Sequence, residues 1–204
     1  MLDQSPYLSA DDRVEYRFAF SGLTRSERER LAAISEEDER RTIPWAFVGH
    51  TTPYRAALVD DLVQSVDPRG FVYTPVAAPY TETGSPHLNQ QQFEGVLERT
   101  RYQIWCSHHS YFYMEPERFR SSLLTGGVPV KVVHTRDDVP RNAPLSYLMM
   151  ESSYLGERLT EKAFGRLRRR FMSDWNEFPT LAQEIARVLG ATGTEIKDYS
   201  SRAA

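Results

Sequence analysis

The chain has 204 residues, of which 40% are hydrophobic and 26% charged, and its formal net charge is −3 at pH 7. These values are ordinary for a soluble globular protein of one domain, and they show no basic excess that would direct the chain to nucleic acid. No apolar run approaches the roughly 20 residues that cross a membrane, and the first residues do not form a signal peptide. We therefore expect a cytoplasmic protein without a transmembrane segment, for which peripheral membrane contact stays open.

The single cysteine, Cys106, excludes an internal disulfide. It lies within an apolar strand pattern, where free cysteine is usually a small buried side chain. The three tryptophans, Trp45, Trp105 and Trp175, are likewise expected in the core or at its edge.

Residues 1–42 are polar and poor in strand pattern, and we interpret them as a lead-in segment. Thr24, with Glu27 three residues later, forms the signature of a capping box, which predicts a surface helix that begins near Arg25. The dense charges that follow are typical of a solvated helix face.

Strand and helix patterns alternate from residue 43 to residue 133. Short apolar strands are predicted over 43–49, 70–76, 102–106 and 128–133, and helices over 53–63, 88–99 and from Pro116 to the glycine pair at 126–127. Such alternation predicts an α/β fold, a Rossmann-like doubly wound parallel sheet covered on both faces. Residues 43–190 form this domain.

Two further helices are predicted after the sheet, over 157–171 and 178–189, and a flexible tail over 191–204. The first helix carries a cluster of arginines that we interpret as a solvated basic face, with an anionic membrane surface or an acidic partner as alternatives: Arg166, Arg168, Arg169 and Arg170.

Polar residues follow the first and third predicted strands, at the edge where doubly wound sheets bind ligands. After the first strand, Thr52 is a good N-cap with Pro53 at the first helical position, so the free amides of this helix form an anion site with Arg55 one turn in. After the third strand come His108, His109 and Ser110, and then the helix that Glu115-Pro116 opens. An ordinary turn without a ligand explains these residues about equally well.

No metal site and no cofactor are predicted. The sequence has no D-x-D motif and no HxxxH or CxxC spacing, and adjacent histidines such as His108 and His109 cannot both face one ion from regular structure. Neither a G-x-G-x-x-G nor a Walker A motif is present.

Three segments in order carry a resemblance: IPWAFVGHTTPYRAALVDDL, QFEGVLERTRYQIWCS and PERFRSSLLTGGVPVKVV. Together they resemble the C-terminal, nucleotide-sugar-binding half of a GT-B glycosyltransferase of the exostosin-like and glycosyltransferase-family-1-like kind, over roughly residues 43–190. The resemblance implies a domain that binds a nucleotide diphosphate sugar and transfers the sugar without a metal. It implies that two loops hold the nucleotide sugar and its diphosphate, with His50, Thr51, Thr52 and Arg55 on one, and His108, His109, Ser110, Glu115, Arg118 and Ser121 on the other.

The chain departs from this family in two ways. Ser121 stands where the family usually carries a glutamate that binds ribose or sugar, although Glu115 or Glu117 could substitute. GT-B enzymes also need a second domain for the acceptor, which a partner subunit or a homo-oligomer would have to supply. The alternatives are a catalytically degenerate nucleotide-sugar-binding or scaffold module and, ranked last because no G-x-S-x-G elbow is present, an unrelated doubly wound hydrolase.

Overall fold

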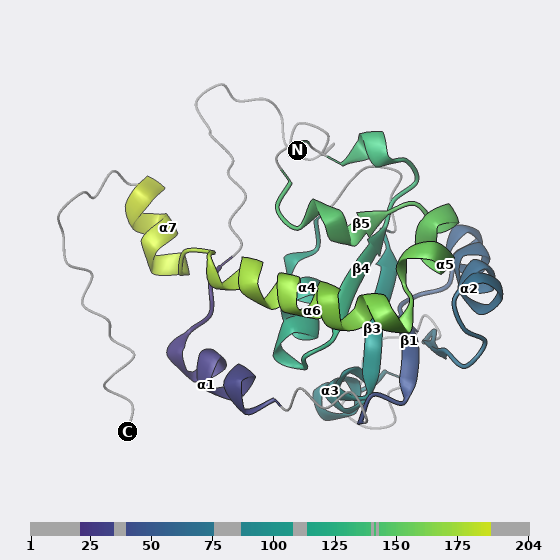
Figure 1. Ribbon diagram of the computed structural model, residues 1–204, viewed down its shortest axis with the longest axis horizontal. Helices are drawn as coiled ribbons and strands as arrows, with labels where there is room; N and C mark the ends of the chain where they lie inside the picture. The colour runs from purple at the N-terminus through teal and green to yellow at the C-terminus, as the bar shows by residue number, and fades with distance from the viewer. Residues whose placement is uncertain are drawn as a thin grey trace.

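A five-stranded sheet forms the centre of the computed structural model, which describes residues 21–34, 40–75, 87–107, 114–139, 141 and 143–188. All the strands are parallel and follow the order β2-β1-β3-β4-β5. Their bounds are β1 Ile43–Val48, β2 Phe71–Tyr73, β3 Thr100–Cys106, β4 Val128–Val132 and β5 Met149–Met150. The predicted doubly wound α/β fold is confirmed, and Figure 1 shows the sheet between its helices.

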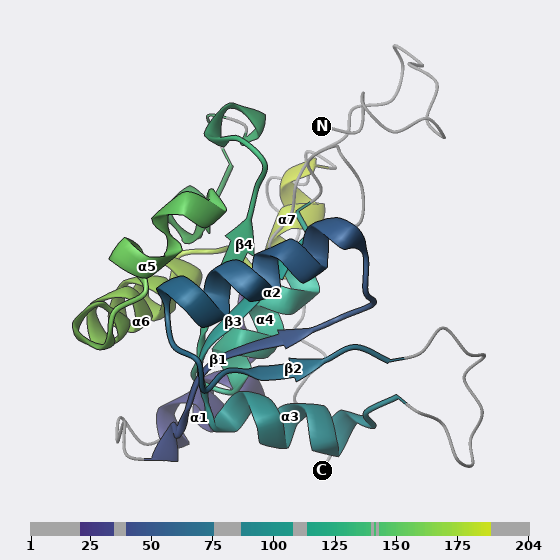
Figure 2. The same ribbon diagram turned by 90° about the vertical axis from the view of Figure 1, so that its right-hand side faces the viewer.

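Helices cover both faces of the sheet (Figures 1 and 2). Because successive side chains of a strand point to opposite faces, β3 identifies the two layers. The Trp105 ring meets Phe119 of α4 edge-on, and the Tyr102 ring meets Phe164 of α6 in the same way. The helices are α1 Arg25–Ala33, α2 Pro53–Ser65, α3 Gln90–Glu98, α4 Pro116–Leu124, α5 Leu155–Arg158, α6 Glu161–Asn176 and α7 Leu181–Val188.

Local signals place the two helices, α2 and α4, that follow β1 and β3. The Thr52 hydroxyl accepts a hydrogen bond from the amide of Arg55, and Pro53 follows at the first helical position, so α2 begins where predicted. Just after the C-terminal end of α4, Gly126 has φ of +73°, and the amide of Gly127 donates to the carbonyl of Ser122. The predicted glycine C-cap is confirmed.

The strand order defines a switch point between β1 and β3. From β1 the chain first crosses to β2 and then returns to β3 on the other side. The helices that follow β1 and β3 lie on opposite faces, so the connections diverge at the carboxyl ends of these strands. Strand pairing between β1 and β3 ends at Ala46 and Gln103.

Two predictions about the C-terminal helices are wrong. The single helix expected over 157–171 is instead the short α5 and the long α6, because Thr160 ends the first and caps the second by accepting from the amide of Ala163. Arg168, predicted on a solvated face, is only 6% exposed and lies beside Gly126. In α7, Leu181 and Ile185 are 57% and 49% exposed.

The segment interpreted as a lead-in contacts the domain. Its helix α1 is mostly exposed, as expected, but Leu23 and Leu31 are buried in the main core. The amide of Gly22 donates to the carbonyl of Pro179 at 2.7 Å, which joins the two ends of the described chain. Residues 1–20 and the predicted tail lie outside the described residues. In the part of the chain that is described, none of the helices is long and apolar enough to span a membrane.

Candidate functional site

Arg55 holds the two strands of the switch point together. Its guanidinium donates from Nη1 to the carbonyl of His50, at the end of β1, and from Nη2 to the carbonyl of Cys106, the last residue of β3. Both carbonyls lie beyond Ala46 and Gln103, where the pairing of β1 with β3 ends, so Arg55 bridges the two strands past their last pair. Gly49 leaves room for this arrangement, since a Cβ there would stand 3.2 Å from Nη1. Arg55 is 1% exposed, so its main visible role is structural.

A network of buried and half-buried charges lies next to this point, on the α4 face of the sheet. Glu115, just before α4, accepts from Lys131 Nζ at 2.6 Å and from Trp105 Nε1 at 2.8 Å on one carboxylate oxygen. Arg118 Nε is 3.3 Å from its other oxygen, and Arg118 Nη1 donates to the carbonyl of Val48. Glu115 takes a left-handed conformation, with φ of +53°, which turns its side chain toward the strands.

Cations outnumber carboxylates in this network. Within the described ranges, Arg118 and Lys131 both contact the one carboxylate of the network, that of Glu115, and Arg55 lies close enough to repel Arg118. Burial lowers the pKa of the Arg118 guanidinium, with Glu115 opposing the change and repulsion from Arg55 adding to it. Burial also lowers the pKa of the Lys131 ammonium, although Glu115 acts in the opposite direction. The carboxyl edge of the sheet is therefore suited to an anion, whose charge would offset this excess.

A cleft of about 440 Å³ opens beside the network, between the carboxyl ends of β1 and β2 and the first turns of α3 and α4. We call it the carboxyl-edge cleft. This volume lies within the range of small-molecule sites in proteins. Its polar walls are His50, Tyr73, His87, Gln90, Glu117, Arg118 and Ser121. The Arg118 side chain is 27% exposed, so it contacts both the network and the cleft.

The structure brings some of the predicted site residues together and separates others. His50, Arg118 and Ser121 line the carboxyl-edge cleft. Thr51 and Thr52 lie at the start of α2, on the opposite face of the sheet from α4.

Three other predicted residues, His108, His109 and Ser110, lie outside the described residues. Glu115 is engaged by Lys131 and Trp105, so its carboxylate does not face the cleft as a free group. The Ser121 hydroxyl donates to the carbonyl of Glu117 at 2.9 Å, one turn earlier in α4.

Three contributors were not predicted from the sequence. Lys131 stands among valines in β4 and is 1% exposed, and this charge in the middle of an apolar strand was an available signal. Tyr73 and His87 flank a stretch without a regular pattern, so nothing in the sequence placed them near α4.

Among the described residues, no three side chains of His, Cys, Asp or Glu converge as metal ligands would. Comparison with known proteins finds no family model that matches this sequence and no match among curated proteins.

Proposed function

We propose that the carboxyl-edge cleft binds the diphosphate of a nucleotide diphosphate sugar, and that the chain is the donor-binding domain of a glycosyltransferase. A second domain or subunit would bind the acceptor. The observation that carries the proposal is the position of Arg118. Its guanidinium reaches the cleft at the carboxyl edge of a parallel sheet, beside the switch point between β1 and β3, the place where doubly wound folds bind their ligands.

The chemistry of sugar transfer fits a cation at this position. When the glycosidic bond breaks, negative charge develops on the leaving diphosphate. A fixed guanidinium and the amino end of α4 would stabilise that charge in place before the reaction begins. Arg118 is held by Val48 and Glu115, so it would lose little freedom on binding.

A screen of UDP, GDP and ADP by melting temperature tests the proposal. A nucleotide at 100 times its dissociation constant adds about 2.7 kcal/mol to the stability of the folded chain. We expect one nucleotide to raise the melting temperature, and Arg118→Ala to abolish the rise. Arg99→Ala is the matched control, because Arg99 lies at the amino-terminal edge of the sheet, where it donates to Thr42.

Either of two results would count against the proposal. The first is no change in melting temperature with any of the three nucleotides. The second is an equal loss of the nucleotide-induced rise in melting temperature in Arg118→Ala and Arg99→Ala. An equal loss would mean that the nucleotide responds to the net charge of the chain and not to the position of Arg118. Arg118→Lys keeps the positive charge and should retain part of the rise in melting temperature. It therefore shows whether the loss in Arg118→Ala comes from the missing charge or from a misfolded variant.

Ser121 favours a second candidate, a binding module that has lost transferase chemistry. Its hydroxyl donates its only proton within α4, so it offers a sugar hydroxyl a neutral acceptor where a glutamate would offer a charged one. Under this alternative the chain binds the nucleotide sugar without transferring the sugar. Ser121→Glu should then tighten nucleotide-sugar binding by about tenfold, as expected for one hydrogen bond to a charged group. Unchanged binding would remove Ser121 from the site.

A further inference from the structure

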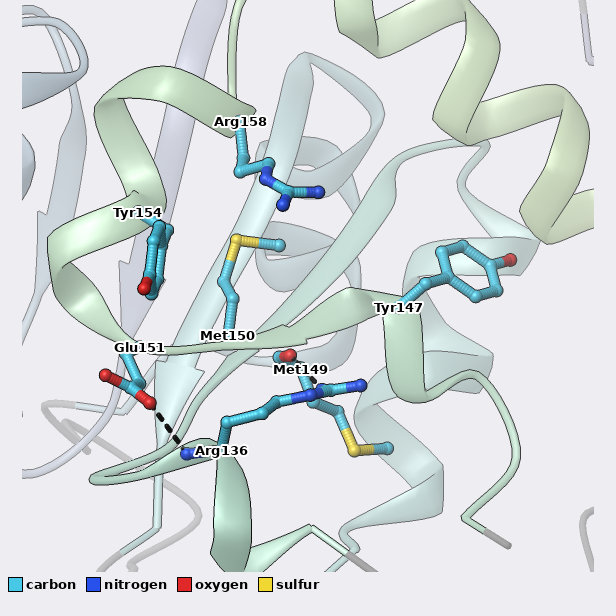
Figure 3. A pocket seen from close by; sticks show the side chains of 7 residues that line it. All are labelled: Arg136, Tyr147, Met149, Met150, Glu151, Tyr154 and Arg158. Atoms are coloured by element: carbon cyan, nitrogen blue, oxygen red, sulfur yellow. Dashed lines mark hydrogen bonds between the residues drawn. The ribbon is translucent and has the colours of Figure 1, made fainter. Parts of the chain in front are cut away.

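A second cavity lies at the other end of the strand order, beside the edge strand β5. Its volume is about 430 Å³, and we call it the edge cavity. Figure 3 shows Arg158 and Met150 on one side of β5 and Arg136 and Met149 on the other. Tyr154 flanks Met150, and Glu151 lies below Tyr154 near Arg136. None of these residues belongs to the carboxyl-edge cleft.

Arg136 is fixed in place by the backbone of the edge strand. Its Nη1 donates to the carbonyls of Ser146 and Met149, and its own amide donates to Glu151 Oε1 at 2.8 Å. The carbonyl of Met149 is therefore satisfied, which protects this edge from pairing with another strand. The other guanidinium nitrogens of Arg136 make no hydrogen bond to the described part of the chain, so they remain available to a ligand.

Arg158 differs from Arg136, since no hydrogen bond or ion pair holds it within the described ranges. Its side chain extends from α5 toward the cavity (Figure 3). The charged residues that line the cavity are Arg136, Arg158 and Glu151, two cations and one anion with a sum of +1. A monoanion matches this sum better than a phosphate dianion, which would meet the carboxylate of Glu151.

The apolar part of the cavity indicates the body of the ligand. Met149 and Met150 are 2% and 9% exposed, whereas Tyr154 is 48% exposed and offers its ring to the cavity. Thioethers make favourable contacts with aromatic rings and adapt to their shape. A flat ring between Met150 and Tyr154 would cover this apolar surface.

We propose that the edge cavity binds an aromatic monocarboxylate. The ring lies against Met150 and Tyr154, and the carboxylate pairs with the planar fork of Arg158, the geometry that guanidinium groups favour. This site is independent of the nucleotide site, because the cleft lies beside β1 and β2 and the cavity beside β5.

Methionine-methyl NMR with 2-naphthoate as the probe tests the proposal. The chain has five methionines, and the resonances of Met149 and Met150 can be assigned through Met149→Leu and Met150→Leu. We expect saturable shifts of these two methyl signals, with no shift of Met114, which is fully buried beside Glu115. The neutral 2-naphthamide should bind about tenfold more weakly, because it lacks the charge that pairs with Arg158.

Arg158→Ala should weaken 2-naphthoate binding about tenfold. Arg166→Ala, which removes the same charge from the neighbouring hollow at the start of α6, should leave binding nearly unchanged. Equal losses in the two variants, equal binding of the amide, or shifts of Met149 and Met150 produced by inorganic phosphate at the same concentration would each overturn the proposal. UDP should not shift the methyl signals of Met149 or Met150. The 2-naphthoate experiment and the nucleotide screen can therefore succeed or fail independently of each other.

Discussion

Glutamine in place of Glu115 should destabilise the protein by about 3 kcal/mol. Removal of one partner from a buried ion pair typically costs about 3–5 kcal/mol, because the other charge stays in a poorly solvated place. The side chain of Lys131 is 1% exposed and that of Glu115 is 15% exposed, so both are shielded from water. Lys131 keeps its hydrogen bond to Ser107, which sets the expected cost at the lower end of the range.

Urea unfolding measures this change, and a loss of about 3 kcal/mol corresponds to a melting temperature about 6–12 °C lower for a chain of this size. The sign of the pH dependence is a second readout. Because burial already lowers the folded-state pKa of Lys131, the unfolded state binds more protons between the folded and unfolded pKa values, and stability rises with pH there. Without the opposing charge of Glu115 this pKa falls further, so Glu115→Gln should regain more stability than the unmodified chain as the pH rises toward the ordinary lysine pKa of 10.5.

The double variant separates the ion pair from other effects of the substitution. Glu115→Gln with Lys131→Met removes both charges, so it should lose at least about 1 kcal/mol less than the sum of the two single variants. A loss below about 1 kcal/mol for Glu115→Gln, or additive losses in the double variant, would refute the reasoning. Either result would mean that the pair at 2.6 Å contributes little to the fold.

Two further predictions concern backbone and ion-pair contacts away from the cleft. Gly126→Ala should destabilise by more than about 1 kcal/mol in urea unfolding, because φ is +73° and a Cβ would stand 2.6 Å from the guanidinium of Arg41. The control Gly95→Ala, in α3 with nothing within 4 Å, should instead stabilise by about 0.5–1 kcal/mol, and equal effects at both sites would contradict the geometry. For Glu27, burial would raise the pKa, but hydrogen bonds from Thr24 and Arg120 lower it overall, so its contribution to stability is present at neutral pH and is lost as the pH falls below its ordinary value near 4.5. Melting curves of Glu27→Gln should accordingly show a weaker loss of stability in acid than the unmodified chain, and identical acid profiles would exclude this role.

The alternation of strand and helix patterns was enough to predict the sheet and its direction. Parallel strands need crossovers, and capping residues such as Thr52 and Gly126 mark where these helices begin and end. The break between α5 and α6 was missed because Leu155, Leu159 and Ala163 keep helical spacing across it. Only Thr160, an N-cap residue inside that pattern, indicated that two helices meet there.

Charge proved harder to interpret than apolar spacing. Arg55 and Arg168 were both expected to face solvent or a ligand, yet they are 1% and 6% exposed. An arginine becomes buried when carbonyls from distant segments can accept from it, as His50 and Cys106 accept from Arg55. Such partners are neighbours in the fold and not in the sequence, so no local pattern predicts them.

The sequence predicted only the part of the candidate site that follows from strand order. Residues that directly follow a parallel strand lie at the carboxyl edge whatever the details of packing, and His50 lines the cleft as this rule implies. Lys131 and Glu115 depend instead on side-chain directions, including the left-handed backbone at Glu115. A network of this kind becomes visible only when the strands are placed side by side.

A crystal structure of the chain with the nucleoside diphosphate that most raises its melting temperature tests the central claim most directly. We predict that the diphosphate lies in the carboxyl-edge cleft, within hydrogen-bonding distance of the Arg118 guanidinium and close to His50. A diphosphate bound at the edge cavity, or at the amino-terminal edge of the sheet near Arg99, would contradict the assignment of the cleft.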